Sequence, residues 1–258
     1  MPIAALRTCA GVVAVAAYVL VVGPPALAWA LLTRRPQVLY SAGRLGVRLG
    51  FALVGIRLRL LGTEHILHRA AVYAANHSSN VEPPAVFLAL SPLFPNLRIV
   101  YKAELRKLPV LVWVWDVAGF VPLERGNPAQ SRPAIDAAAA ALRAGHSFVI
   151  FPEGTRSRTG ELLPFKKGGF ILALKAGSPI VPMTVSGGRA AMRKGSPLIW
   201  PATVTITFSP PVETAGLALD ARDAVIARVR TAIAGHLPPA RADSSGPSKP
   251  AAVARNSE

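Results

Sequence analysis

The hydrophobic and polar positions of this chain form an oily N-terminal stretch, a mixed middle and a polar end. In the middle, short apolar or alternating runs closed by Gly, Pro or a polar cluster predict β-strands. These runs cover residues 56–60, 71–75, 98–101, 120–123, 148–151, 180–185 and 204–208. Apolar runs with helical spacing predict helices at residues 85–90, 128–144, 169–176 and 220–236. Strands that alternate with helices predict an α/β fold with a mixed, largely parallel sheet flanked by helices.

The N-terminal apolar stretch spans residues 9–32 and is long enough to cross a membrane, which takes about 20 residues. Pro24 and Pro25 interrupt it, and each proline removes a backbone donor and clashes with the preceding helical turn. Two structures fit this pattern equally well: a kinked single span, or a two-helix hairpin buried in one leaflet. Residues 43–54 are a second apolar stretch with two arginines one turn apart, which predicts an interfacial helix.

Composition and charge favour a location at a membrane. The formal net charge is +16, yet only 16% of the residues are charged and 52% are hydrophobic. A basic but oily protein suits an anionic membrane surface, where each nearby Lys or Arg adds about 1 kcal/mol of attraction. The arginines after the apolar stretch predict that this side faces the cytoplasm; they are Arg34, Arg35, Arg44 and Arg48. The single cysteine, Cys9, excludes an internal disulfide and argues against a cysteine-ligated metal site.

An imidazole and a carboxylate follow the strand predicted at residues 71–75. His77 and Glu82 are five residues apart, about 140° around a continuous helix, so on a helix they would not meet. In a strand–loop–helix connection, the loop folds His77 back over the start of the helix. Glu82 precedes Pro83 and is expected at or just before the helix N-terminus, where the helix dipole favours an ionised carboxylate. A carboxylate bonded to one ring nitrogen would leave the other free as a general base.

The sequence favours a nucleophile that comes from the substrate. Ser78 and Ser79 adjoin His77, but neighbouring side chains in a loop tend to diverge, and Cys9 lies in the N-terminal apolar stretch. A substrate hydroxyl that is deprotonated by His77 and attacks an activated acyl carbonyl needs no enzyme nucleophile. An isolated His-x-x-x-x-Glu pair would be better interpreted as a histidine satisfied in a polar loop, and it is the context of further polar turns that reverses this.

Two further polar turns follow the strands predicted at residues 120–123 and 148–151. Their candidate substrate-binding residues are Arg125, Glu153, Gly154, Thr155 and Arg156. A guanidinium group binds phosphate through two parallel hydrogen bonds, and a glycine lets the backbone approach a ligand. Glu153 is suited to orient an arginine or to accept a substrate hydroxyl. Open α/β sheets bind ligands at the carboxyl ends of their strands, so these turns predict a phosphate site and, with the dyad, acyl transfer onto a phosphate-bearing alcohol.

With these motifs the chain resembles the glycerophospholipid acyltransferase family, especially the bacterial 1-acyl-sn-glycerol-3-phosphate (lysophosphatidic acid) acyltransferases. His77 and Glu82 resemble the catalytic H-x-x-x-x-D motif. Residues 119–125 resemble the second motif, whose arginine is implicated in glycerol-phosphate binding, and residues 151–157 match the third almost letter for letter. The pair Val181-Pro182 resembles the fourth motif, which is associated with the acyl-donor side.

The resemblance covers about residues 56–215. Together with the hydrophobic pattern it divides the chain into N-terminal membrane-associated helices at 1–55, an acyltransferase domain at 56–237 and a tail at 238–258. The tail is polar, without apolar periodicity, and is predicted to be disordered. The chain departs from the family at Glu82, where Asp is usual; the side chain is one methylene longer, a difference that bears on rate and acceptor preference.

The resemblance implies transfer of a fatty acyl group from a thioester donor, acyl-CoA or acyl-carrier protein, to the sn-2 hydroxyl of 1-acyl-sn-glycerol 3-phosphate, which gives phosphatidic acid. His77 would be the general base, oriented by Glu82. The resemblance implies no metal and no bound cofactor. It also implies a place at the inner (cytoplasmic) membrane, with the catalytic domain on the cytoplasmic face and an anionic membrane surface as a partner.

Three alternatives stay open. Another lysolipid, or glycerol phosphate itself, would serve as acceptor with the same motifs, because acceptor choice depends on the shape of the pocket. A degenerate acyltransferase disabled by Glu82 would regain activity when Asp is restored. A non-catalytic basic membrane-binding protein has only the net charge in its favour, and no nucleic-acid motif with aromatic stacking residues appears in the sequence.

Overall fold

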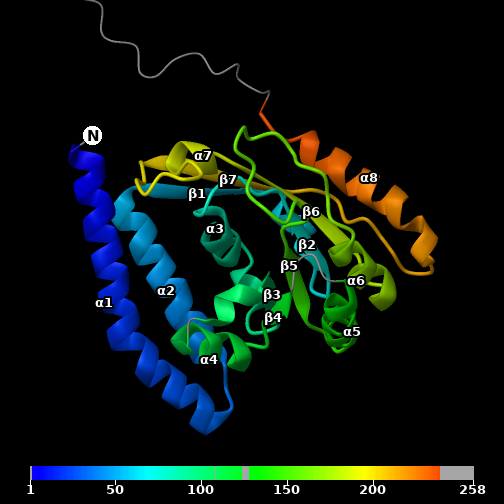
Figure 1. The fold of residues 1–258 in the computed structure, drawn as a ribbon, viewed down its shortest axis with the longest axis horizontal. Helices are drawn as coiled ribbons and strands as arrows, with labels where there is room; N and C mark the ends of the chain where they lie inside the picture. The colour runs from blue at the N-terminus through cyan, green and yellow to red at the C-terminus, as the bar shows by residue number, and fades with distance from the viewer. Residues whose placement is uncertain (1, 108, 124–127, 239–258) are drawn as a thin grey trace, which may run out of the picture.

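The computed structural model of this chain describes residues 2–107, 109–123 and 128–238. Within these ranges a seven-stranded sheet forms the centre, in the order β1-β7-β6-β2-β5-β3-β4 (Figure 1). The strands are β1 Ile56–Leu61, β2 Val72–Ala75, β3 Leu97–Lys102, β4 Val121–Leu123, β5 Ser147–Ile150, β6 Ile180–Ser186 and β7 Ala202–Phe208. Neighbouring strands are parallel except β6 and β7, which are antiparallel. The predicted α/β fold with a mixed, largely parallel sheet is confirmed.

Helices surround this sheet. They are α1 Pro2–Thr33, α2 Gln37–Val54, α3 Glu82–Ala89, α4 Pro109–Val117, α5 Pro128–Arg143, α6 Gly168–Ala176, α7 Gly188–Ala191 and α8 Arg222–Ala234. Short 3₁₀ turns occupy Thr63–His65, Ser91–Leu93, Ala103–Lys107 and Leu219–Ala221. The sequence did not predict α4 or α7, because α4 is short and almost uniformly apolar and α7 is a single turn, so neither has a helical period to detect. All but the first residue of the predicted disordered tail lie outside the described residues.

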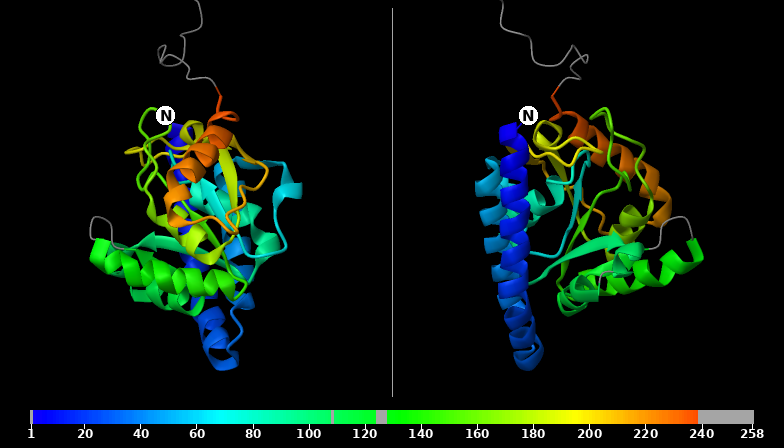
Figure 2. Two further views of the ribbon diagram at one scale, coloured as in Figure 1. Left: turned by 90° about the vertical axis from the view of Figure 1, so that its right-hand side faces the viewer. Right: turned by 60° about the vertical axis from the view of Figure 1, so that its left-hand side comes forward.

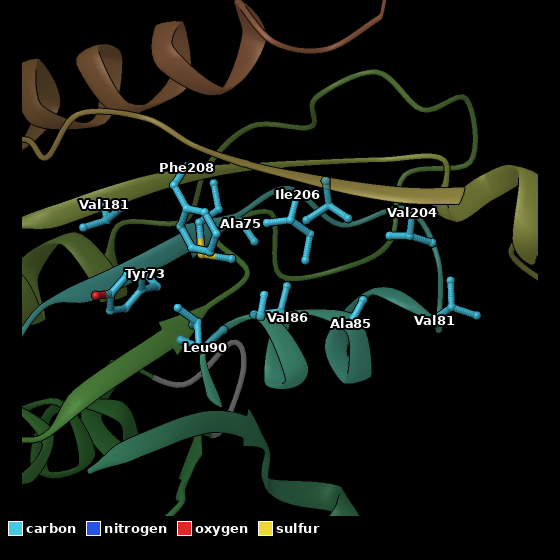
Figure 3. Close-up of a cluster of buried hydrophobic side chains, with 14 of the residues drawn as sticks. Tyr73, Ala75, Val81, Ala85, Val86, Leu90, Val181, Val204, Ile206 and Phe208 are labelled. Carbon is cyan, nitrogen blue, oxygen red and sulfur yellow. The ribbon is translucent and has the colours of Figure 1, made fainter. Parts of the chain in front are cut away.

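Alternate residues of the central strands build two hydrophobic cores, one on each face of the sheet. Tyr73 and Ala75 of β2 pack with α2 and α3, whereas Val72 and Ala74 pack with α5, α6 and α8. Figure 3 shows the first core, with Ala85 and other side chains of α3 against the sheet. Since successive side chains of a strand point to opposite faces, a strand covered on both faces has a continuous apolar sequence. This is why the central strands were predictable.

The first two helices form a hairpin, but its turn is not where the sequence suggested. α1 continues as one helix through Pro24 and Pro25, and the chain reverses at residues 34–36, so that α2 lies beside α1 (Figure 2). The turns after the prolines contribute the buried side chains Ala26, Leu27 and Ala30. This packing keeps the helix intact across the prolines. Of the two structures that the sequence left open, the hairpin broken at Pro24-Pro25 is wrong, and a single helix runs across both prolines. In the part of the chain that the structure describes, α1 alone has the length and apolar composition for a membrane crossing.

Candidate active site

The polar turns after residues 75 and 150 leave adjacent strands. β2 and β5 are parallel neighbours, with Val72 opposite Phe148, so both turns emerge at the same edge of the sheet. The first turn leads directly into α3, which begins at Glu82. The carboxyl ends of parallel strands are the usual ligand site of open α/β sheets. The fold therefore brings together two motifs that lie some seventy residues apart in the sequence.

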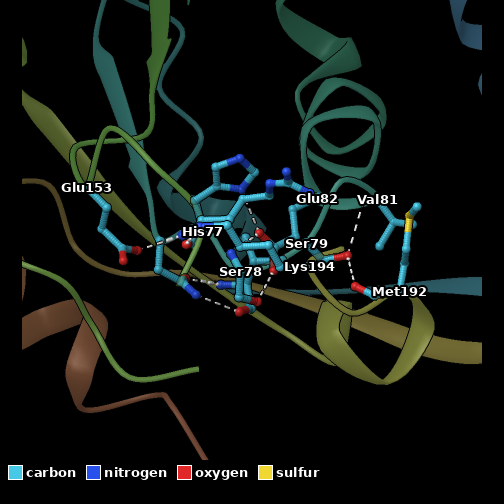
Figure 4. Close-up of polar contacts among 11 residues, drawn as sticks. His77, Ser78, Ser79, Val81, Glu82, Glu153, Met192 and Lys194 are labelled. Carbon is cyan, nitrogen blue, oxygen red and sulfur yellow. Dashed lines mark hydrogen bonds and ion pairs between the residues drawn. The ribbon is translucent and has the colours of Figure 1, made fainter. Parts of the chain in front are cut away.

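His77 and Glu82 form a hydrogen-bonded pair at this edge. His77 Nδ1 lies 2.9 Å from Glu82 Oε2 (Figure 4). The Glu82 side chain is fully buried, whereas 16% of the His77 side chain is exposed. Glu82 is the first residue of α3, as expected for a carboxylate at a helix N-terminus. The extra methylene of Glu82 thus does not prevent the pair from forming.

Ser78 supplies two more donors to the Glu82 carboxylate. Its backbone N–H donates to Oε2 at 2.6 Å, and its hydroxyl donates to Oε1 at 2.5 Å. An ionised carboxylate only accepts hydrogen bonds, so Nδ1 of His77 carries the hydrogen that joins the pair. Nε2 then holds a lone pair, and no hydrogen bond to it occurs among the described residues. This arrangement fixes the tautomer of His77 and leaves Nε2 able to accept a proton.

The turn after β5 holds the backbone of His77. Buried Glu153 accepts a hydrogen bond from the His77 N–H at 2.7 Å through Oε1, and one from the Leu163 N–H at 3.0 Å through Oε2. The His77 carbonyl accepts from the Ser157 N–H at 2.8 Å, and the Phe151 ring lies 4.5 Å from the imidazole. Burial raises the pKa of the Glu153 carboxyl, and its two hydrogen bonds act in the opposite direction. The turn that was expected to bind substrate therefore holds the backbone of His77 in place.

The other candidate substrate-binding residues lie in different settings. Gly154 has a φ of 69°, and its N–H donates to the carbonyl three residues earlier, which closes the turn. Thr155 is exposed. Arg156 is half-buried, and its carbonyl accepts a hydrogen bond from Lys194 Nζ at 2.9 Å. Arg125 lies outside the described residues. Substrate binding by these residues and by Glu153 stays a prediction.

Val181 and Pro182 lie within β6, opposite Tyr73 and Ala74 of β2. Both are buried, and Val181 belongs to the core that α3 covers. Pro182 also contributes its carbonyl, which accepts from the Ser209 N–H at 2.9 Å. The fourth motif is therefore part of the central sheet, and its link to the acyl-donor side stays a prediction.

Sequence reasoning missed the residues that support the loop of residues 76–82, which carries the proposed dyad and is named the catalytic loop here. The Asn76 amide donates to the Val185 carbonyl at 2.9 Å and accepts from the Val185 N–H at 2.7 Å, which fastens the loop to β6. The Ser79 hydroxyl donates to the Met192 carbonyl at 2.7 Å. The available signal was the run of small polar residues directly after a buried strand, since polar groups that become buried need hydrogen-bond partners.

An apolar cavity of about 700 Å³ lies beside the catalytic loop, between α1 and α2. Asn80, Val81 and Pro84, which flank Glu82 in the sequence, line it together with Met192 and Ile199. Most of the remaining wall comes from apolar side chains and glycines of the two helices. Ligand pockets in proteins have volumes of about 300–1,000 Å³, so the size is sufficient for a ligand, and the lining suits a hydrocarbon chain.

Within the described ranges, no group of three or more His, Cys, Asp or Glu side chains is arranged to hold a metal ion. The described part of the site contains a histidine–carboxylate pair at a strand end, with an apolar cavity next to it. These features place the chain among α/β proteins with a histidine–carboxylate pair at a strand end, an arrangement that is able to take a proton from a hydroxyl group.

Comparison with known proteins identifies the family within this class. The family model described as Acyltransferase matches residues 57–186, and the chain belongs to this acyltransferase family. A 1-acyl-sn-glycerol-3-phosphate acyltransferase from Limnanthes douglasii is 35% identical over 188 residues, which are 72% of this chain and 65% of the relative. One from Pseudomonas aeruginosa is 28% identical over 174 residues, which are 67% of this chain and 66% of the relative.

A solved structure has the same fold. It is the crystal structure of the 1-acyl-sn-glycerophosphate (LPA) acyltransferase PlsC from Thermotoga maritima, which matches with a TM-score of 0.74 at 23% identity. The match covers 90% of this chain and 97% of that one. In sequence, the chain matches only part of its relatives: 65% of the length of the Limnanthes douglasii relative and 59% of the length of a relative from Cocos nucifera.

Proposed function

We propose that this chain is a 1-acylglycerol-3-phosphate O-acyltransferase of phospholipid biosynthesis. It transfers a fatty acyl group from a thioester to the sn-2 hydroxyl of 1-acyl-sn-glycerol 3-phosphate and releases phosphatidic acid and a thiol. One observation carries the proposal: His77 is held through Nδ1 by a buried carboxylate, which leaves Nε2 as the base, next to a cavity suited to a hydrocarbon chain. The relatives named above support the choice of substrates.

In the proposed reaction, Nε2 of His77 takes the proton of the acceptor hydroxyl as its oxygen attacks the thioester carbonyl carbon. The Glu82 carboxylate stabilises the imidazolium that forms, through the 2.9 Å hydrogen bond at Nδ1. The tetrahedral intermediate then expels the thiolate as the carbon–sulfur bond breaks, and the imidazolium returns its proton to the sulfur. The products are the new ester and a free thiol, and His77 is again neutral.

Basic residues would bind the phosphate of the acceptor. The candidates are Arg125 and Arg156, with Thr155 and the backbone at Gly154 as further donors. Lys194 supports this part of the site by its hydrogen bond to the Arg156 carbonyl. Because guanidinium groups bind phosphate in a bidentate manner, loss of either arginine should raise the KM for the acceptor more than it lowers kcat.

The cavity between α1 and α2 would hold an acyl chain while the thioester carbonyl lies at His77. Large apolar side chains on the outer surface of α1, such as Leu20 and Leu32, are 74% and 84% exposed. We infer that the hairpin is embedded in the inner membrane with the catalytic domain on its cytoplasmic face. The acceptor, itself a membrane lipid, would then reach His77 without leaving the bilayer.

The deciding experiment measures thiol release from oleoyl-CoA by purified protein in detergent, with and without lysophosphatidic acid. Release that depends on the acceptor is expected in the wild type, with a loss of about 10²–10⁴-fold in the His77→Ala variant. Both proteins should unfold in a cooperative thermal transition, because Ser78 still donates two hydrogen bonds to the buried Glu82 carboxylate in the variant. A His77→Ala variant with full activity would contradict the proposed mechanism.

The same assay with other substrates tests the finer assignments. Oleoyl-acyl-carrier protein replaces oleoyl-CoA in one arm to identify the donor. Glycerol 3-phosphate and lysophosphatidylcholine replace lysophosphatidic acid in the other arms. Activity only with an acceptor that lacks a phosphomonoester would overturn the proposed acceptor but not the reaction class. Absence of release with every pair would favour the non-catalytic alternative.

A further inference from the structure

The Glu82 carboxylate is packed directly against the backbone of Gly188, the first residue of α7. A Cβ atom at position 188 would lie 2.5 Å from Glu82 Oε1, 2.9 Å from Cγ and 3.0 Å from Cδ. Real Cβ contacts are not that short, so a side chain at this position and the present position of Glu82 exclude one another. Both residues are buried, which leaves neither of them room to move into solvent.

Glu82 has no free direction in which to yield. Its carboxylate is held by His77 Nδ1 and by the N–H and hydroxyl of Ser78, at 2.5–2.9 Å. Any displacement large enough to relieve a methyl group at position 188 would lengthen these hydrogen bonds together. The backbone at Gly188 is helical and not in the left-handed region, so conformational freedom does not explain the glycine. The glycine is explained by the space that the Glu82 carboxylate needs.

We propose that Gly188 is a positioning residue for the catalytic dyad: it provides the space that lets a glutamate, one methylene longer than aspartate, reach His77 from the first residue of α3. The inference rests on the proposed role of His77 as general base. It further implies that the residues at positions 82 and 188 depend on each other: a glutamate at 82 requires a glycine at 188.

The test is a four-variant cycle of the full-length protein: wild type, Glu82→Asp, Gly188→Ala and the double variant. Gly188→Ala should lower kcat by about 10²-fold with little change in KM, because a displacement of about 1 Å at a reacting group has an effect of that size. Glu82→Asp alone should also lower kcat, since the shorter side chain retreats from His77. When Gly188→Ala is already present, Glu82→Asp should instead raise kcat. An equal decrease caused by Glu82→Asp in both backgrounds would overturn the proposal.

A second readout does not depend on catalysis. The low-field proton NMR resonance of the His77 Nδ1 hydrogen, assigned by its loss in His77→Ala, reports the hydrogen bond to the carboxylate directly. It should be present in the wild type and absent in Gly188→Ala, and it should be present at higher field in Glu82→Asp and in the double variant, whose shorter carboxylates make a longer hydrogen bond. If the protein acylates no acceptor but this pattern holds, the proposed function fails and the coupling stands. A resonance that persists unchanged in Gly188→Ala would overturn the coupling.

Gly169→Ala is the matched control for crowding. A Cβ there would lie 2.3 Å from Ile150 Cδ1, as close as at position 188, but against the other core of the sheet. Its effects should add to those of Glu82→Asp without changing their sign, as expected for sites that share no partner. If the Gly188→Ala substitution prevents folding with either side chain at position 82, the crowding lies elsewhere and the proposal is wrong.

Discussion

The catalytic loop, residues 76–82, and the α1–α2 hairpin both border the site, but hydrogen bonds hold the first and packing holds the second. In the loop, the side chains of Asn76, His77, Ser78, Ser79 and Glu82 all have hydrogen-bond partners. The hairpin lines most of the cavity with apolar side chains and carries many exposed ones. Directional bonds set the positions of the polar atoms in the loop, whereas the apolar wall of the cavity imposes no direction and suits a flexible chain. The difference predicts that mutations in the two regions affect different measurements.

Among substitutions in the catalytic loop, we expect Glu82→Ala to have the largest effect. It removes the shared acceptor of His77 and Ser78 and leaves buried donors unpaired. We expect kcat to fall by about 10²-fold or more, because the base loses its fixed tautomer, and the free energy of unfolding to fall by about 1–3 kcal/mol. Steady-state kinetics and chemical unfolding measure the two effects. Wild-type kcat in this variant would show that the carboxylate does not orient the base.

The corresponding change on the hairpin side is Val47→Phe, which fills part of the cavity. We expect kcat/KM to fall about tenfold for long-chain donors and to change little for short ones, since a pocket that loses a few methylenes of space discriminates by this order. The control Val13→Phe adds the same group at an exposed position of α1 that does not line the cavity. Equal losses for all chain lengths would contradict an acyl-binding cavity.

Glu153 holds the His77 end of the catalytic loop, and the pH dependence of stability tests the effect of its burial. Burial raises the pKa of this carboxyl above its ordinary value of 4.5. As pH rises above 4.5, the folded protein therefore retains a proton that the unfolded chain has released, and the free energy of unfolding decreases until the folded-state pKa is passed. Glu153→Gln has no such proton. The difference in unfolding free energy, wild type minus variant, should fall over this range in pH-dependent unfolding curves; a difference that rises with pH would contradict the burial effect.

The smallest expected effect concerns Thr8, one of the few hydrogen-bonding side chains of α1. Its hydroxyl donates to the Ala4 carbonyl at 2.7 Å and accepts from the Ile199 N–H at 2.9 Å. Thr8→Val keeps the shape and removes both bonds, so the free energy of unfolding should fall by about 1 kcal/mol. Thermal unfolding in detergent checks this value, with Thr33→Val, whose hydroxyl bonds only within the helix, as control.

Prediction from sequence succeeded where the local pattern carried the physical cause. Each strand was an apolar or alternating run closed by a breaker, and each appeared within a few residues of its predicted bounds. Prediction failed where distant packing decided the outcome. At Pro24 and Pro25 the sequence left a single helix and a hairpin equally open, and the packing of the turns that follow decides for the continuous helix. The polar turn after β5 was expected to bind substrate, and its hydrogen bonds to the His77 backbone were not foreseen.

By itself, the sequence determined the α/β fold, the family and the pairing of His77 with Glu82, because these depend on residue order and on side-chain chemistry close along the chain. Only the tertiary structure decided how that pairing is sustained. The acceptor of the His77 N–H is 76 residues away, and the space that Glu82 occupies exists because Gly188 has no side chain. Contacts between such distant residues depend on the register of the sheet and on how its helices pack, and no local pattern records either.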